Sequence, residues 1–203
     1  MSSPLSLVQS SRIPSESPIL DFDLVVHDGR ILLVCADFSG AVFSWDPIAD
    51  EWTGHQLDNP WEPGGYEFGD VMAIGAQVVG GRIVVGGGGE HQSLAQWDLE
   101  TGRVRVHADP DFGGTATVIS AQLDGRSLFV SGDSSVPAPV RVWDASDQDE
   151  LTEGGDIDSY AEDMELSGHL DGVGGLATGT IDGKPLIVSG SWDCGVRGWE
   201  IRS

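Results

Sequence analysis

Few residues of this 203-residue sequence lie at spacings that a catalytic or binding motif requires. The run from Gly86 to Gly89 could form a phosphate-binding loop, because glycine-rich loops cradle phosphates. However, no Lys-Ser or Lys-Thr pair follows this run and no helix is predicted to begin there, so the usual anion site at a helix N-terminus is missing. The sequence has no GxSxG, HExxH or EF-hand spacing either. We therefore expect a turn between strands here, no catalytic residues, and a protein that is not an enzyme.

Residues that commonly bind metals are few and scattered. The sequence has five histidines at predicted strand ends and loops, and its two cysteines, Cys35 and Cys194, form no CxxC pair. Two cysteines are too few for a disulfide framework, so we expect reduced thiols and no metal or cofactor. The first twenty residues contain neither an export signal nor a membrane span. These features predict a cytoplasmic protein.

Charge is the unusual feature of the composition. Asp and Glu number 33 against 10 Lys and Arg, which gives a formal net charge of −23. Such a field repels nucleic acid and anionic membranes and attracts basic partners. We therefore expect a protein partner with a basic surface, and no direct contact with nucleic acid or membrane. The alternative is a general acidic bias with no functional meaning.

Acidic residues are densest in residues 144–165, which hold ten acids and no base. This range is longer than a turn between two strands needs, so we interpret it as an insertion and a solvated loop. It is a candidate docking element for an Arg- or Lys-rich surface; the alternatives are a solubilising loop or a loose calcium site. The candidate partner-binding acids are Asp147, Asp149, Glu150, Asp156, Asp158, Glu162 and Asp163.

A second candidate surface lies in a stretch rich in Pro and Gly. Trp61, Tyr66 and Phe68 fall within the sequence DNPWEPGGYEFGD. Aromatic side chains in a loop commonly anchor a protein partner. They could equally cover an edge of the fold.

The elements that would position these loops follow from four related stretches. Each begins with an Asp-Gly or Gly-Gly turn, continues with an apolar run and a small polar turn, and ends with Trp and an acid. The stretches are DGRILLVCADFSGAVFSWD, GGRIVVGGGGEHQSLAQWD, DGRSLFVSGDSSVPAPVRVWD and DGKPLIVSGSWDCGVRGWE. They end in Trp45-Asp46, Trp97-Asp98, Trp143-Asp144 and Trp199-Glu200, which places the repeats roughly 50 residues apart.

The repeats predict an all-β fold. Their apolar runs are rich in Val, Ile, Leu and Phe, are bounded by Gly, Asp and Ser, and show no helical period. Adding the short apolar stretches on either side gives about four strands per repeat. A four-stranded unit cannot bury both of its faces alone, and radial stacking of such units gives a β-propeller.

The pattern resembles the WD-repeat (Trp-Asp repeat) β-propeller family. The resemblance covers roughly residues 20–203 and is strongest in the last repeat, where Gly168 and His169 precede SGSWDCGVRGWE. The resemblance implies a buried hydrogen-bonded set of Asp193, His169, Ser189 or Ser191, and Trp199. Asp37 with Trp45 and Asp133 with Trp143 look like partial versions, while the repeat of Trp97 has no Asp in its turn. All of these residues are expected to be structural framework.

We expect residues 21–203 to form four WD-like blades, at approximately 21–58, 69–108, 115–169 and 172–203. Family propellers usually have seven or eight blades, so four are too few for one such ring. We favour an eight-bladed ring formed by a homodimer. The alternatives are a four-bladed ring in which residues 1–20 supply a closing strand for the last blade, and a half-ring completed by a different protein.

The resulting functional prediction is a non-enzymatic protein–protein interaction scaffold with a strongly acidic surface. One alternative is an acidic inhibitor or immunity protein that covers the cationic cleft of a basic toxin or nuclease. Another is a small-ligand binder or enzyme that uses the central channel. Fold-level analogy cannot separate these functions, because one fold hosts many.

Overall fold

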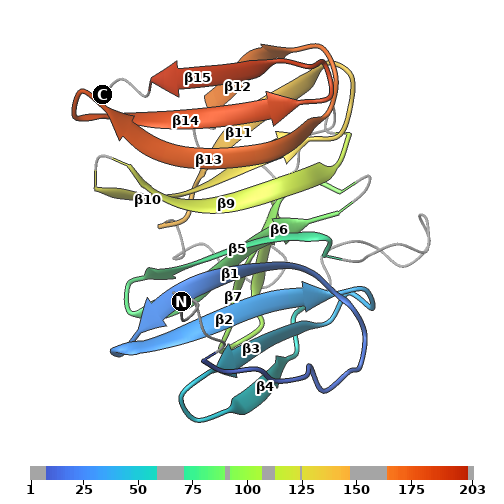
Figure 1. Ribbon diagram of the computed structural model, residues 1–203, viewed down its shortest axis with the longest axis vertical. Helices are drawn as coiled ribbons and strands as arrows, with labels where there is room; N and C mark the ends of the chain where they lie inside the picture. Colours follow the sequence, from blue (N-terminus) through green and yellow to red (C-terminus); the bar gives the residue numbers. More distant parts are fainter. Residues whose placement is uncertain are drawn as a thin grey trace, which may run out of the picture.

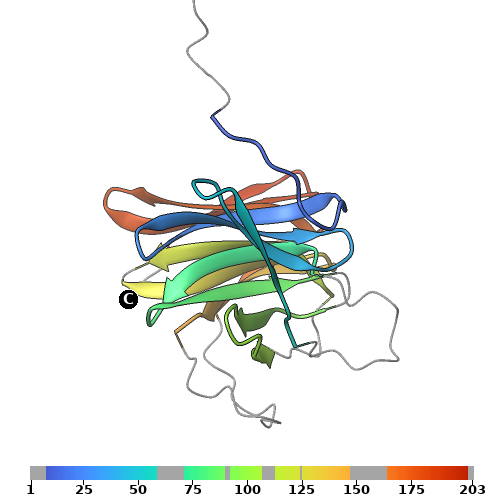
Figure 2. The same cartoon turned by 90° about the horizontal axis from the view of Figure 1, so that it is seen from below.

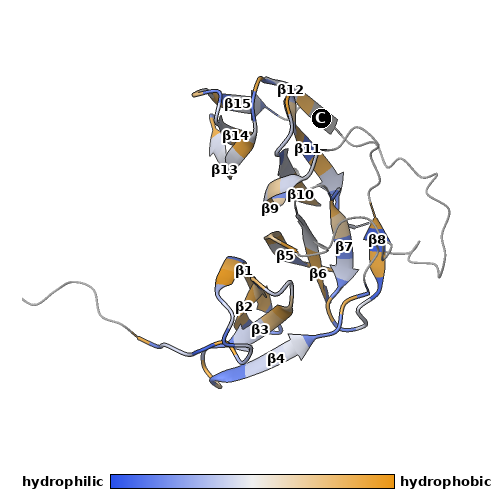
Figure 3. Cartoon of the chain, turned by 90° about the vertical axis from the view of Figure 1, so that its right-hand side faces the viewer, coloured by the Kyte–Doolittle hydropathy of each residue, from blue (hydrophilic) through white to orange (hydrophobic). Residues whose placement is uncertain are grey.

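The computed structural model describes residues 8–58, 71–89, 92–106, 113–123, 125–146 and 164–200. In these ranges the regular elements are β-strands, arranged in four antiparallel sheets that follow one another along the chain (Figure 1). Seen from the side, the sheets follow an arc whose two ends are the first and the fourth sheet (Figure 3). The all-β prediction is therefore confirmed, and a single copy forms an open arc rather than the closed ring of the single-chain alternative.

Each sheet takes its strands from one repeat. The first sheet contains β1 (Ile19–His27), β2 (Arg30–Asp37), β3 (Val42–Asp46) and β4 (Glu51–His55), and the second contains β5 (Ala73–Val79), β6 (Arg82–Gly88), β7 (Ala95–Asp98) and β8 (Val104–Val106). The third contains β9 (Thr115–Leu123), β10 (Arg126–Asp133), β11 (Ala138–Asp144) and β12 (Met164–His169). The fourth has three strands within the described range: β13 (Val173–Ile181), β14 (Lys184–Ser191) and β15 (Val196–Glu200).

In the first, second and fourth sheets, the Asp-Gly and Gly-Gly pairs of the repeats form the turn between the first two strands. Both residues have a positive φ at Asp28-Gly29, at Gly80-Gly81 and at Asp182-Gly183. Two successive residues with positive φ make the two-residue hairpin turn that matches the twist of the flanking strands, and Asp and Gly tolerate this conformation best. The sequence motif therefore closes the same hairpin in these three sheets.

The four sheets share one register. The second strand pairs with the Trp strand through Leu33 and Trp45, and the matching pairs are Val85 with Trp97, Phe129 with Trp143, and Ile187 with Trp199. The first strands of the sheets are β1, β5, β9 and β13, and we call them the inner strands. They contact one another in that order along one side of the arc (Figure 3). Equivalent positions can therefore be compared from sheet to sheet.

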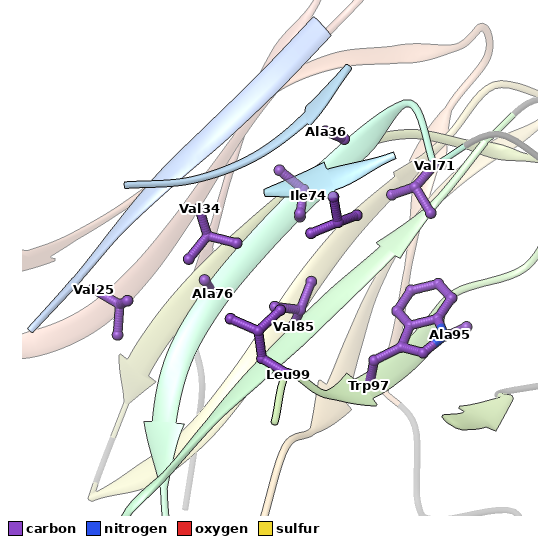
Figure 4. Close-up of a cluster of buried hydrophobic side chains, with 11 residues drawn as sticks. Val25, Val34, Ala36, Val71, Ile74, Ala76, Val85, Ala95, Trp97 and Leu99 are labelled. Atoms are coloured by element: carbon purple, nitrogen blue, oxygen red, sulfur yellow. The ribbon is translucent and has the colours of Figure 1, made fainter. Parts of the chain in front are cut away.

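The apolar core lies between neighbouring sheets. Val25 and Val34 of the first sheet pack against Ile74, Val85 and Trp97 of the second (Figure 4). A second cluster joins the second and third sheets, and a third joins the third and fourth; their main side chains are Val84, Leu94, Phe129 and Trp143, and Val130, Val140, Val173 and Ile187. Each internal sheet is thus buried on both faces, as stacked repeats require.

Close approach between sheets explains part of the glycine run. A Cβ atom added at Gly86 would lie 2.7 Å from the ring of Phe129, in the neighbouring third sheet. A Cβ atom at Gly88 would lie 2.6 Å from Oγ1 of Thr115, also in the third sheet. These glycines let the second and third sheets approach closely. The expectation of a turn is wrong for Gly86 to Gly88, which lie in β6; Gly86 and Gly88 face the third sheet, which leaves no room for a side chain there.

The described part of the N-terminal segment, residues 8–18, lies against the first sheet. The N–H of Phe38 donates to the carbonyl of Pro18 at 2.8 Å, and Trp52 Nε1 donates to Ser11 Oγ at 3.0 Å. Figure 2 shows this segment leading into the first sheet. The described residues of this segment therefore do not supply a closing strand for the fourth sheet of their own chain. None of the described residues forms a helix long and apolar enough to cross a membrane.

The two thiols differ sharply in environment, which predicts different reactivity. Cys35 is buried in β2, and burial together with the nearby charge of Asp37 raises its pKa to about 11; Cys194 is exposed in the turn between β14 and β15. Since the thiolate is the reactive form, we expect Ellman's reagent at pH 8 to modify one thiol rapidly and the other only after unfolding. Cys194→Ser should remove the rapid phase. Two rapid thiols in the folded protein would contradict this burial.

Candidate interaction surfaces

The last repeat brings together the four side chains that the family resemblance pairs. His169 ends β12, Ser189 lies in β14, Asp193 lies in the following turn, and Trp199 lies in β15. His169 Nδ1 is 3.0 Å from Asp193 Oδ2, and His169 Nε2 is 2.8 Å from Ser189 Oγ. Trp199 Nε1 is 3.0 Å from the same Oγ atom. Of the two serines considered, Ser189 is the one that completes the set.

One assignment of protons satisfies the whole chain of groups. Trp199 Nε1–H donates to Ser189 Oγ, whose hydroxyl donates to His169 Nε2, and His169 Nδ1–H donates to Asp193. Asp193 also accepts from the N–H groups of Leu170 at 3.0 Å and Gly195 at 2.7 Å. We name this group of four residues the Trp199 set.

The Asp193 carboxylate is strongly favoured in its charged form. Its pKa lies well below the ordinary value, chiefly because the backbone N–H of Leu170 donates to it, with further donors at His169, Gly195 and Arg197. Arg197 Nη1 lies 2.9 Å from Asp193 Oδ2 and is also close to His169 Nδ1. The carboxylate therefore ties the loop after β12 to the turn before β15.

The order Ser, His, Asp is also the order of a hydrolase triad, but the surroundings do not suit that chemistry. A catalytic serine must present its Oγ atom to a substrate carbonyl. Ser189 has no exposed surface, His169 is 1% exposed, and Oγ of Ser189 is already held by the indole of Trp199. The Trp199 set is therefore suited to joining the third sheet, through His169 of β12, to β14 and β15 of the fourth.

Two other repeats hold partial sets. Trp143 Nε1 donates to Ser131 Oγ at 2.7 Å, and the buried Asp133 accepts from the N–H of Ser135 at 2.7 Å. In the second sheet, Trp97 Nε1 donates to the carbonyl of Asp58 at 2.8 Å. A backbone group thus replaces the missing serine in that repeat.

The first sheet differs from the others because Cys35 occupies the position of the serine. Trp45 Nε1 donates instead to Asp50 Oδ1 at 3.1 Å, and the Trp45 ring stacks on Trp52. Asp37 still holds its own turn by accepting from the N–H groups of Ser39 at 2.9 Å and Ala41 at 3.1 Å. Trp45 and Asp37 therefore do not form one connected set.

His55 occupies a junction between two sheets. Its Nε2 atom is 2.8 Å from Ser44 Oγ in the first sheet, and its Nδ1 atom is 3.1 Å from the carbonyl of Leu99 in the second. Burial lowers the pKa of His55, so the neutral ring is favoured. The residue links two sheets without carrying a charge into their joint.

The acid after each Trp has a partner that the sequence analysis missed. It pairs with the base that follows the first turn of the same repeat. The pairs are Arg30 with Asp46 at 3.4 Å, Arg82 with Asp98 at 3.0 Å, Arg126 with Asp144 at 2.8 Å, and Lys184 with Glu200 at 2.6 Å. A base at the third position of each of the four aligned stretches was the available signal.

A pocket of about 330 Å³ opens on the inner strands. Its polar lining comes from Asp21, Asp23, Thr117, Ser120 and Thr178. Both carboxylates already accept backbone hydrogen bonds: Asp21 from Ile74 and Asp23 from Ala76, each at 2.9 Å. Asp23 also accepts from Ser120 Oγ at 2.7 Å, and burial raises the pKa of Asp21. These acids fasten β1 to β5 and β9.

Both sequence-predicted docking loops lie outside the described residues. This applies to Trp61, Tyr66 and Phe68 and to the acids from Asp147 to Asp163. In the part of the chain that the structure describes, no group of three or more His, Cys, Asp or Glu side chains is placed to hold a metal ion.

The low pKa of Asp193 predicts a pH-dependent contribution to stability. In the unfolded chain an Asp has a pKa of about 3.9. Because folding lowers this value, the carboxylate stabilises the fold above about pH 4, and this contribution is lost as the pH falls through the folded-state pKa. We expect Asp193→Asn to lower the melting temperature at pH 7 and the difference from wild type to shrink below pH 4.

Asp182→Asn supplies a matched control, because Asp182 is exposed in the turn between β13 and β14. This control should melt close to wild type at both pH values. A constant difference between Asp193→Asn and wild type from pH 7 to pH 3 would show that the charge of Asp193 does not stabilise the Trp199 set.

Comparison with known proteins supports the fold alone. No protein-family model matches the sequence, and no curated protein matches it. The structure is similar to that of U3-55K, a WD40 β-propeller protein, with a TM-score of 0.62 and 16% identity over 92% of this chain and 50% of that chain. It is also similar to the computationally designed Ika4 protein, with a TM-score of 0.58 and 19% identity over 98% of this chain and 100% of that chain. The chain thus spans half of U3-55K, and its four antiparallel sheets are arranged like those of a WD40 propeller.

Proposed function

We propose that this chain is a non-enzymatic protein-interaction scaffold in the cytoplasm, which works as a homodimer and docks a protein with a basic surface. The likeness to a WD40 protein supports an interaction scaffold in general. The acidic surface and the basic partner rest on the charge of the chain. The proposed docking elements remain residues 144–165, which we call the acidic run, and the stretch that contains Trp61, Tyr66 and Phe68, which we call the aromatic loop.

The observation that carries this proposal is how the few cations are used. Arg30, Arg82, Arg126 and Lys184 each pair with an acid of their own sheet, and Arg197 pairs with Asp193. At least five of the ten Lys and Arg residues therefore serve ion pairs within the described framework, and ten cations cannot balance 33 acids. The surplus negative charge is left to act on a partner, where it raises the association rate and helps to select a basic surface.

The inhibitor alternative uses the same charge against a narrower target, the cationic cleft of a toxin or nuclease. Co-purification of one basic enzyme in a one-to-one complex that lacks activity would favour it. The channel alternative has less support, because Asp21 and Asp23 in the inner pocket already bind backbone N–H groups. Their positions are explained by the joint between β1 and β5.

Charge reversal with matched net charge tests the docking role of the acidic run. One variant carries Lys at Asp147, Asp149 and Asp156; the control carries Lys at Glu51, Asp58 and Glu100, which are exposed acids outside residues 144–165 and lie at none of the positive-φ turn positions. We expect fluorescent nona-arginine in 0.15 M NaCl to bind the first variant at least tenfold more weakly than wild type. The control should lose less than threefold, because local charge density dominates at distances below the Debye length of about 8 Å.

The comparison separates a docking element from a general charge effect. An equal loss in both variants would mean that only net charge matters, and the acidic run would lose its special role. Undiminished binding in the first variant would contradict its role outright. The same pair of variants then serves to test any basic protein that co-purifies with the wild-type chain.

A further inference from the structure

The two ends of the arc each present a sheet face that no other sheet of the chain covers. On β1 the side chains of Phe22, Leu24 and Val26 are 56%, 58% and 65% exposed, and Figure 3 shows β1 at one end of the arc. The equivalent residues of β5 are Ile74, Ala76 and Val78, which face the first sheet and are buried or half-buried there. The exposed side chains therefore occupy positions that are covered at an internal joint.

The middle of the free face of the fourth sheet is built from small residues, which are flanked by the exposed Ile181 and Val196. Gly175, Gly179 and Gly190 have nothing within 4 Å of the position where a Cβ atom would lie. Ala177 and Val188, which pair with each other between β13 and β14, take the places of Asp23 and Val34 in the first sheet. One end of the arc thus carries bulky apolar side chains, and the other carries small residues at its centre.

The internal joints show how such faces fit. The first residue of an inner strand rests on a glycine near the end of the second strand in the preceding sheet. At the joint between the third and fourth sheets, Cγ1 of Val173 lies 2.6 Å from the Cβ position of Gly132. At the joint between the second and third sheets, Oγ1 of Thr115 lies 2.6 Å from the Cβ position of Gly88. Both joints therefore use the same contact between a protruding side chain and a glycine, and we call this contact the seat.

Each end of the arc holds half of this seat. Ile19 pairs with Asp37 as Thr115 pairs with Asp133 and Val173 with Ser191, so it is the equivalent first residue, and it is 43% exposed. Gly190 pairs with Gly175 as Gly132 pairs with Thr117, so it is the equivalent glycine, and its Cβ position is open. One end of the arc therefore presents the protruding side chain, Ile19, and the other end presents the uncovered glycine, Gly190.

We propose that a second copy of this chain covers both end faces at once, with the first sheet of each copy packed on the fourth sheet of the other. Ile19 of one copy then rests on Gly190 of the other, and Phe22, Leu24 and Val26 cover its glycine-rich face. The two joints are related by a twofold axis, so the assembly closes as a ring of eight sheets. This inference rests on the homodimer of the proposed function and specifies its contact surface. A different protein would have to offer both complementary faces, whereas a second copy already carries them.

The charge of the chain adds a distinguishing property. Two copies of net charge −23 repel each other, while the proposed joint is apolar. Salt screens the repulsion and leaves apolar burial intact. The dimer is therefore expected to tighten as NaCl rises from 0.05 to 0.5 M, opposite to the response of a complex with a basic partner.

Sedimentation velocity across a concentration series tests the assembly on the whole chain. Wild type is expected to sediment as a species of twice the 21.4 kDa chain mass. Gly190→Leu should weaken the dimer at least tenfold without unfolding the chain, because its side chain would enter open space in a single copy. The double variant Ile19→Gly with Gly190→Leu moves the protruding side chain to the other face and should recover most of the lost affinity.

Control variants separate the joint from general effects. Leu24→Asp places a charge in the proposed joint and should give monomers, whereas Val136→Asp alters an exposed apolar residue in a turn of the third sheet and should leave the dimer intact. Gly132→Leu should instead lower the melting temperature, because Val173 already fills its space. Circular dichroism at equal concentrations checks the folding of each variant.

The proposal is overturned if wild type is monomeric at 100 µM in 0.5 M NaCl, or if a ring forms only with a different protein. It is also overturned if Gly190→Leu and Leu24→Asp both dimerise like wild type. The nona-arginine assay is read separately, because its charge reversals leave the seat of Ile19 on Gly190 unchanged. Loss of the dimer with intact peptide binding would therefore remove this inference and leave the basic-partner hypothesis standing.

Discussion

Burial of both faces of each sheet is the constraint on which the rest of this structure depends. A sheet made of three or four short strands has apolar side chains on two sides, and the internal sheets meet this demand by stacking. Stacking at close distance in turn requires small residues where a neighbour protrudes, as at Gly86 and Gly132. The hairpin turns, the register and the position of the glycines all follow from bringing equivalent sheets together in the same way.

The polar interior follows from the same stacking. Once a sheet packs against its neighbour, an indole N–H or a carboxylate shielded from water must find a partner inside the fold. Trp199 and Trp143 find a serine hydroxyl, Trp97 finds a backbone carbonyl, and Trp45 reaches an exposed acid. The quality of each set varies from repeat to repeat because several different acceptors satisfy the same donor. Variation of these residues therefore does not signal variation of the fold.

Much of the framework could be predicted from the sequence because its signals are local. The Asp-Gly turns, the Trp-acid endings and the β-rich runs each reflect the conformation of a few neighbouring residues, and the grouping of Asp193, His169 and Ser189 followed from a family resemblance. The structural role of Gly86 and Gly88 could not be predicted, because it depends on Phe129 and Thr115 in another repeat. The pairing of Arg30 with Asp46 could be predicted only from an alignment of the four repeats, which shows a base at the third position and an acid at the last position of each stretch. Contacts between residues of different sheets are therefore the features that this single sequence does not predict.

The charge and the end faces act at different distances, and this difference gives each a separate role. A net charge of −23 is felt over roughly a Debye length, about 8 Å at physiological salt, so it sorts basic from acidic partners before contact. The seat between Ile19 and Gly190 acts only at contact, where shape decides. Two identical chains repel until their end faces are in register, so wrongly aligned encounters gain no apolar burial to offset the repulsion. A strongly acidic chain with complementary ends can therefore associate with itself in one arrangement while its remaining surface stays free for a partner of opposite charge.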